Sequence, residues 1–244
     1  MQRIVLHIEY EGTGYCGWQV QKNGTSIQQK IGDAIFKRTG ETIFPEASGR
    51  TDAGVHALCQ VAHFDTQSGI PPEKFAVALN TALPGDIRIK RSFLAEEGFH
   101  ARFSAKGKQY RYVIQNAPVA SAIMRNFCMF FPMELDISAM REGAAHMLGT
   151  HDFSAFCAAG TDIKGTVRTV DKIELARDGE YITINVFGGG FLYNMVRIMT
   201  GTLLLVGQRK ILPGDVAAIV AGKERKHAGP TVPPGGLYLV RVFY

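Results

Sequence analysis

Residues 49–64 read GRTDAGVHALCQVAHF, a polar loop that runs directly into an apolar segment. The glycines of the loop let its backbone bend tightly, while Arg50, Thr51 and Asp52 present three hydrogen-bonding side chains within the bend. The apolar continuation predicts a strand that includes Val61–Phe64. The rest of the chain is organised around this loop and strand.

Length and composition set the broad class. The chain has 244 residues, of which 46% are hydrophobic, enough to bury a substantial core as one large domain or two small ones. No apolar run approaches the roughly 18 residues that cross a bilayer, and the N-terminus opens on a strand pattern rather than a signal peptide. The cysteines form no CxxC pair, which predicts reduced thiols. We expect a soluble cytoplasmic protein.

The charge distribution is moderately basic. Lys and Arg number 27 against 22 Asp and Glu, a net charge of +5. The basic residues gather in three clusters, and aromatic residues are interleaved in the middle one: Arg88–Arg91, Arg102–Arg111 and Lys223–Lys226, with Phe99, Phe103, Tyr110 and Tyr112. Two interpretations stay open on this pattern alone, a surface for a polyanion such as nucleic acid and ordinary solvated strand faces.

The order of the predicted elements indicates an α+β fold. Residues 1–100 predict strand, helix, strand, strand, helix, strand, the ferredoxin-like order in which two split units share one antiparallel sheet. Residues 101–244 repeat this theme with longer elements, and a hairpin is predicted across Asp178-Gly179. We expect the boundary between the halves near Glu96–Ala105, which gives an N-terminal half over 1–100 and a C-terminal half over 101–244.

Three further segments predict secondary-structure elements. Thr42–Phe44 is expected to form a short strand before the opening loop. Pro71 and Pro72 are expected to start a helix that runs through Leu79. Farther on, Phe191–Val206 predicts a long apolar helix that follows three consecutive glycines.

A metal site near the loop is one hypothesis, because His56, Cys59 and His63 lie close together in the sequence. On a helix the three side chains would share a face, as zinc ligands require. On a strand His56 points to one face and the other two point to the opposite face. The pattern of residues 61–64 favours the strand, and packed histidines, over a metal.

Asp52 is the candidate nucleophile or base, although an aspartate before Ala-Gly is often only a turn former. Arg197 lies within the predicted apolar helix, where an arginine is costly unless a carboxylate pairs with it. Asp52 is one candidate partner, and such a contact would keep it ionised and able to attack. Asp152 and Glu174 are the competing partners for a purely structural ion pair.

The chain resembles the tRNA pseudouridine synthase A family along its whole length. The resemblance rests on stretches that occur in the family's order: Tyr10–Thr13, Gly17–Gln19, Gly49–Ala57, Leu79–Asn80, Phe99–Ala105, Lys108–Tyr112, His151–Phe156, Phe191–Arg197 and Gly236–Leu239. It implies an isomerase that converts uridines at tRNA positions 38–40, in the anticodon arm, to pseudouridine. It also implies two ferredoxin-like, RRM-like halves that form one extended, mainly antiparallel sheet with helices on one face.

The same resemblance assigns roles to four residues. Asp52 matches the catalytic aspartate, and Arg197 matches the basic residue that pairs with it. Tyr110 matches the aromatic residue that packs on the target base, and Arg50 the residue that fills the space of a flipped nucleotide. The family works without cofactor or metal, as a homodimer with tRNA as its partner. Cys59 departs from the family pattern, since a glycine is expected there.

The implied reaction breaks the bond between uracil N1 and the ribose and rejoins the base through C5. One carboxylate in a dry pocket suits this reaction, because water would divert it to base loss. Attack of Asp52 on the ribose and formation of a glycal both remain open. Two rival hypotheses are a non-catalytic RNA-binding protein with exposed aromatic residues on its sheet and a metal-dependent hydrolase.

Overall fold

The computed structural model describes residues 1–22, 24–158 and 165–244. The chain divides into two compact units, Met1–Lys106 with Tyr238–Tyr244 and Gly107–Leu237, which we call unit 1 and unit 2. Residues 101–106 and the last strand thus group with the N-terminal elements, whereas the sequence pattern placed them in a half over 101–244. The reason is strand pairing, since the C-terminal strand runs parallel to a strand of unit 1. Each unit is described by itself.

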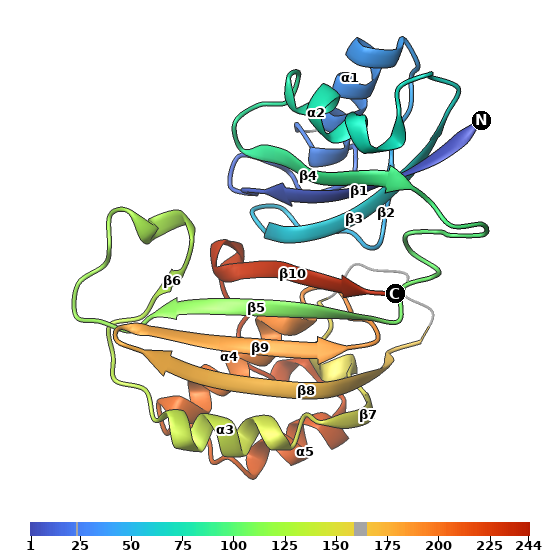
Figure 1. The fold of residues 1–244 in the computed structure, drawn as a ribbon. Helices are drawn as coiled ribbons and strands as arrows, with labels where there is room; N and C mark the ends of the chain where they lie inside the picture. The colour runs from blue at the N-terminus through green and yellow to red at the C-terminus, as the bar shows by residue number, and fades with distance from the viewer. Residues whose placement is uncertain (23, 159–164) are drawn as a thin grey trace. The chain divides into compact units, whose positions relative to one another are not determined.

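Unit 1 combines β-strands with a layer of helices. Its elements are β1 (Gln2–Tyr10), α1 (Ile27–Thr39), β2 (Glu46–Ala47), β3 (His56–Thr66), η1 (Pro72–Lys74), α2 (Phe75–Asn80), β4 (Ile87–Leu94) and β10 (Leu237–Phe243). The strand order is β4-β1-β3-β10; β1 is antiparallel to β3 and β4, and β10 is parallel to β3. The short strand β2 pairs with β3 at His63 and Ala62, on the edge of β3 opposite β1. In Figure 1, α1 and α2 lie together on one side of these strands.

Local sequence explains the ends of α1 and the packing of the helical layer. The Ser26 hydroxyl caps the helix by accepting a hydrogen bond from the Gln29 N–H at 3.2 Å. Gly40 ends it in a left-handed conformation, with φ of 77°. Between sheet and helix, the rings of Phe64 and Phe75 pack edge to face, with centroids 5.5 Å apart. The helical pattern predicted for this part of the chain is confirmed.

Unit 2 contains mainly antiparallel strands and a layer of helices. Its elements are β5 (Gly107–Gln115), η2 (Met124–Asn126), β6 (Met129–Phe130), α3 (Ile137–Ala145), β7 (Gly149–Asp152), η3 (Ser154–Phe156), β8 (Val167–Asp178), β9 (Tyr181–Gly188), α4 (Met195–Gly207), α5 (Asp215–Gly222), η4 (Arg225–His227) and η5 (Pro234–Gly236). The strand order is β5-β9-β8-β7, with β6 parallel to β5. Helix α3 contacts both α4 and α5, so the three form one layer. The α+β class with mainly antiparallel strands is confirmed.

Three predicted elements differ from the structure. The strand expected at Thr42–Phe44 is wrong: pairing begins only after Pro45, at Glu46 and Ala47. Proline lacks a backbone N–H and cannot extend a ladder, which explains the late start. The helix expected from Pro71 begins as the single 3₁₀ turn η1 before α2 follows.

The long apolar helix is shorter than expected at its N-terminus. α4 begins at Met195 rather than at Phe191, because Asn194 adopts a left-handed conformation with φ of 59° that interrupts a helical series. Arg197 therefore lies in the first turn of the helix, not in its apolar middle. Among the described residues, the structure contains no helix of the length and hydropathy that a membrane span requires.

Candidate active site

Asp52 lies in the loop that connects β2 to β3 of unit 1. The aspartate is half-buried, Arg50 before it is exposed, and Thr51 between them is buried, with 6% of its surface exposed. The Val55 N–H donates to the Asp52 carbonyl at 3.2 Å and closes a turn at the predicted position. The predicted strand after the loop is confirmed, and β3 is longer than the segment on which the prediction rested.

Thr51 anchors the loop at the residue next to Asp52. Its hydroxyl is hydrogen-bonded to the Tyr10 hydroxyl at 2.7 Å, and both side chains are buried. Its carbonyl accepts a hydrogen bond from the Trp18 N–H at 3.0 Å. Burial raises the pKa of Tyr10 to about 12, so this phenol stays neutral at physiological pH. Asp52 thus directly follows a residue that two buried groups, Tyr10 and Trp18, hold in place.

Two glycines let the segment after β1 approach the loop closely. A Cβ on Gly12 would lie 2.0 Å from the Val55 carbonyl oxygen, and one on Gly17 would lie 2.6 Å from the Thr51 carbonyl oxygen. Gly17 also has φ of 103°, a conformation that L side chains rarely adopt. No larger residue fits either place without moving the loop backbone. The two motifs at 10–13 and 17–19 therefore form a support for the loop that carries Asp52.

Gln60 and His56 hold the two ends of the loop. The Gln60 amide donates to the Gly49 carbonyl at 2.9 Å, and its carbonyl accepts from the Ser48 hydroxyl at 2.7 Å. The His56 Nδ1 accepts from the Gly12 N–H at 3.0 Å, and its ring stacks on Tyr238 at 4.9 Å. Sequence reasoning did not single out these positioning contacts. The signal available to it was the joint occurrence of the motifs at 10–19 and 49–57.

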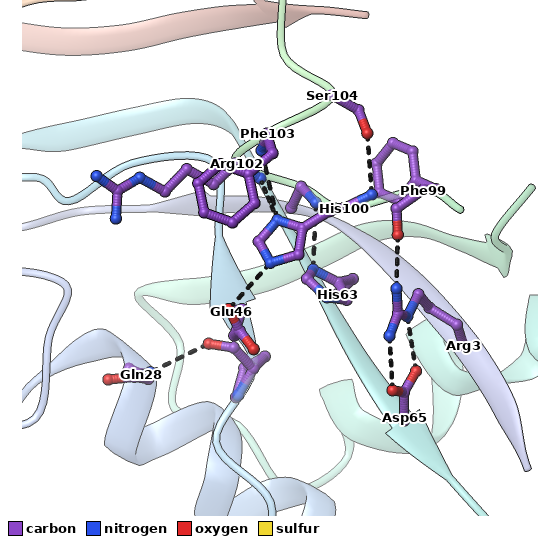
Figure 2. Close-up of polar contacts among 12 residues, drawn as sticks. Arg3, Gln28, Glu46, His63, Asp65, Phe99, His100, Arg102, Phe103 and Ser104 are labelled. Atoms are coloured by element: carbon purple, nitrogen blue, oxygen red, sulfur yellow. Dashed lines mark hydrogen bonds and ion pairs between the residues drawn. The ribbon is translucent and has the colours of Figure 1, made fainter. Parts of the chain in front are cut away.

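The proposed metal ligands do not gather as a group. His56, Cys59 and His63 all lie on β3, as the strand pattern predicts. Among the described residues, the potential ligand atoms that cluster belong instead to Glu46, His63 and His100, within 4.8 Å of one another (Figure 2).

Hydrogen bonds give this second cluster a different character. The His63 Nδ1 accepts from the Ala101 N–H at 3.3 Å, and the His100 Nδ1 accepts from the Arg102 N–H at 3.1 Å. Each Nδ1 therefore presents a lone pair, so in the neutral ring the hydrogen sits on Nε2. The His100 Nε2 lies 3.2 Å from a Glu46 carboxylate oxygen. A nitrogen that carries a hydrogen cannot ligate a metal, and the arrangement fits a hydrogen-bonded cluster.

Tyr110 and Arg197 belong to unit 2. Tyr110 is half-buried near the middle of β5, opposite Val186 of β9, and its ring meets Phe191 edge to face at 5.1 Å. Arg197 is half-buried in the first turn of α4. Its guanidinium donates to the Val232 carbonyl at 2.7 Å and to the Asn194 side-chain oxygen at 2.6 Å.

The two alternative partners of Arg197 have cations of their own. Asp152 lies 3.3 Å from the Lys223 amine, and Glu174 lies 2.6 Å from the Lys172 amine. Hydrogen bonds from Ser154 and Thr166, with Lys223, hold the pKa of Asp152 well below its usual range. Of the four predicted site residues, Arg50 and Asp52 thus share one loop of unit 1, and Tyr110 and Arg197 are built into unit 2.

Comparisons with known proteins identify the family of this chain. A family model described as tRNA pseudouridine synthase matches residues 6–104 and 144–244. The chain is 49% identical to tRNA pseudouridine synthase A of Ruminiclostridium cellulolyticum over 245 residues, which covers 100% of both chains. It is 48% identical to the protein of the same name from Caldicellulosiruptor bescii, again over 100% of both. For Geobacillus kaustophilus the identity is 45%, over 100% of this chain and 95% of the relative. The chain therefore belongs to the tRNA pseudouridine synthase family, whose members isomerise uridine to pseudouridine.

Proposed function

We propose that this chain converts uridines in the anticodon arm of tRNA to pseudouridine, with Asp52 as the group that acts on the ribose. The observation that carries the proposal is the anchoring of Thr51 by Tyr10 and Trp18, which fixes the backbone next to Asp52. A catalytic carboxylate needs a defined position to within a fraction of an ångström. A loop used only as a turn has no need of such support.

The reaction needs one carboxylate and no external reactant. The bond between N1 of uracil and C1′ of the ribose breaks, the base rotates, and a new bond forms between C5 and C1′. The hydrogen on C5 is then lost, and N1 gains one. Asp52 either bonds to C1′ or assists loss of the base to a glycal, and exclusion of water prevents hydrolysis in both cases.

The other three predicted residues supply charge and shape. Arg197 pairs with Asp52 in this proposal and favours its ionised form. Tyr110 packs on the detached uracil. Arg50, exposed on the same loop as Asp52, fills the gap that the flipped nucleotide leaves, which offsets part of the unstacking free energy of a few kcal/mol.

The proposal extends to assembly and location. The enzyme acts as a cytoplasmic homodimer without a metal or cofactor, and its RNA partner is the anticodon arm. Sedimentation at assay concentrations measures the assembly directly, and a monomer in the presence of full activity would overturn the dimer. Activity that persists unchanged in a chelator is expected as well.

Substitution of Asp52 tests the catalytic assignment. Asp52→Asn keeps the size of the side chain but removes the negative charge, so we expect the rate of pseudouridine formation on unmodified tRNA to fall about a thousandfold or more. Binding of the tRNA should change by less than about threefold. Asp33→Asn, on an exposed position of α1, is the matched control and should retain full activity. Turnover by Asp52→Asn at the wild-type rate would overturn the assignment.

A further inference from the structure

Phe103 is the most exposed aromatic side chain among the described residues, with 77% of its surface accessible. It belongs to the turn Phe99–Ser104, whose sequence motif has no role in the proposed catalytic machinery. A single exposed apolar residue is common, but a rigidly held one next to a cation is a candidate contact surface.

The turn that carries Phe103 is fixed by hydrogen bonds at each residue. The Ser104 N–H donates to the His100 carbonyl at 2.9 Å, and the His100 N–H donates to the Ser104 hydroxyl at 3.0 Å. The Phe103 N–H lies within 3.4 Å of the His100 Nδ1, and the Tyr244 hydroxyl donates to the Ala101 carbonyl at 2.7 Å. Figure 2 shows the hydrogen bonds that join His100 to Arg102, Phe103 and Ser104.

The ring of Phe103 rests on a series of rings that leads into unit 1. The ring of His100 lies against Phe103, with centroids 4.4 Å apart and planes inclined by 33°. Behind it, the buried His63 ring contacts His100 at 4.6 Å. Glu46 holds the outer nitrogen of His100. An aromatic ring that is already ordered loses little conformational entropy when a ligand stacks on it.

The charges beside the ring favour a nucleic acid over a protein. The exposed Arg102 places its guanidinium carbon 5.7 Å from the centre of Phe103, and exposed Lys106 follows in the chain. Glu46, an acid that contacts this turn, is paired with His100. An aromatic ring between cations matches a base and its phosphates. A stable contact with a second protein copy would instead call for a contiguous apolar surface, and the chain neighbours of Phe103, Arg102 and Ser104, are polar.

We propose that Phe103 stacks on a nucleobase of the bound tRNA, other than the uridine that reacts, while Arg102 contacts a neighbouring phosphate. This inference rests on the proposed action on tRNA. The surface made by Phe103 and Arg102 increases affinity for the RNA without taking part in the chemistry.

Fluorescence and affinity of Phe103 variants test the proposal. Trp18 is the only tryptophan of the chain and is buried, with 2% exposed, so Phe103→Trp adds a surface fluorophore that can be followed against it. Addition of unmodified tRNA should quench this added fluorescence. The Phe103→Trp variant should bind the tRNA with an affinity within about threefold of the wild type. Phe103→Ala should weaken binding by roughly tenfold or more, the effect of losing one base–aromatic stack.

Arg102→Ala should weaken binding less and lower the salt dependence of log K by about 0.7–0.9, as expected for one phosphate contact. Phe36→Ala on α1, where the side chain is 54% exposed, is the matched control and should bind tRNA as the wild type does. If wild-type protein fails to bind tRNA, the proposed function fails together with this inference. If the wild type binds and Phe103→Ala binds equally well, only the inference is overturned. A change in oligomeric state of Phe103→Ala with unchanged affinity would assign the ring to a protein contact and also overturn it.

Discussion

The loop of Asp52 in unit 1 and the segments around Asp152 and Arg197 in unit 2 are positioned by different kinds of contact. Next to Asp52, Thr51 is held by the neutral phenol of Tyr10 and by backbone bonds from a segment more than thirty residues earlier. In unit 2, the charged side chains make the polar contacts themselves. The Asp152 carboxylate contacts Thr166 and Lys223, and the Arg197 guanidinium contacts Asn194.

This difference has consequences for stability and pH. Close backbone approach depends on shape, so even one added methyl group at a glycine should disturb it strongly. Contacts of a carboxylate depend on its protonation and should weaken in acid. Substitutions in each region therefore test whether close backbone approach or charged contacts hold it in place.

Gly12→Ala should have the largest effect. The new Cβ would lie 2.0 Å from the Val55 carbonyl oxygen, so the support and the loop must separate. We expect a loss of about 3 kcal/mol or more in the free energy of unfolding, measured by denaturant titration, and a large loss of activity. Gly14→Ala, two residues later, is the matched control, because apart from its chain neighbours no atom lies within 4 Å of its Cβ position. Equal stability of the two variants would show that close approach does not hold the loop.

Asn194 tests the local anchoring at the start of α4. Asn194→Ala removes the acceptor for Arg197 and places alanine at φ of 59°, which should cost about 1–2 kcal/mol of stability. Asn194→Gly removes the same acceptor but tolerates this backbone conformation. The difference between the two variants in thermal unfolding therefore measures the strain, and their common loss measures the hydrogen bond. Alanine and glycine variants of equal stability would contradict the strain.

Asp152→Asn should have the smallest effect and a distinctive pH dependence. Hydrogen bonds from Ser154, then Thr166, lower the pKa of Asp152 in the folded state. Its contribution is therefore complete above the unfolded pKa of about 3.9 and is lost as pH falls through the lower folded value. Because the side chain is 25% exposed, we expect a difference from the wild type of at most about 1 kcal/mol at pH 7.

Denaturant titrations from pH 7 to pH 3 measure this dependence. The difference between the wild type and Asp152→Asn should shrink below about pH 4. Tyr10→Phe is the comparison from unit 1. Since burial raises the pKa of Tyr10 to about 12, this phenol is neutral throughout the range, and the difference caused by Tyr10→Phe should not change with pH. A pH-independent difference for Asp152→Asn would remove the electrostatic part of the comparison.

Local sequence was sufficient for most of the fold. Helix α1 could be predicted with both its ends, since Ser26 and Gly40 act on adjacent backbone groups. The strand β3 followed from its apolar run, but the register shift between Ala57 and Gln60 interrupts the strict side-chain alternation on which the argument for opposite faces of His56 and His63 rested. The start of α4 could not be predicted, because the apolar sequence pattern continues through Asn194 while the helical backbone conformation begins only after it.

The sequence by itself determined the α+β class, the position of the Asp52 loop and, through a resemblance, the family and the four proposed site residues. Only the tertiary structure decided what supports that loop. Tyr10 and Gly12 are far in sequence from Thr51, Val55 and His56, and no local pattern reports that Gly12 lies against Val55 or that Tyr10 bonds to Thr51. Such contacts depend on the distance between segments, which local periodicity does not contain. The same reason applies to Phe103, whose exposure and underlying histidine rings appear only once the turn and β3 are brought together.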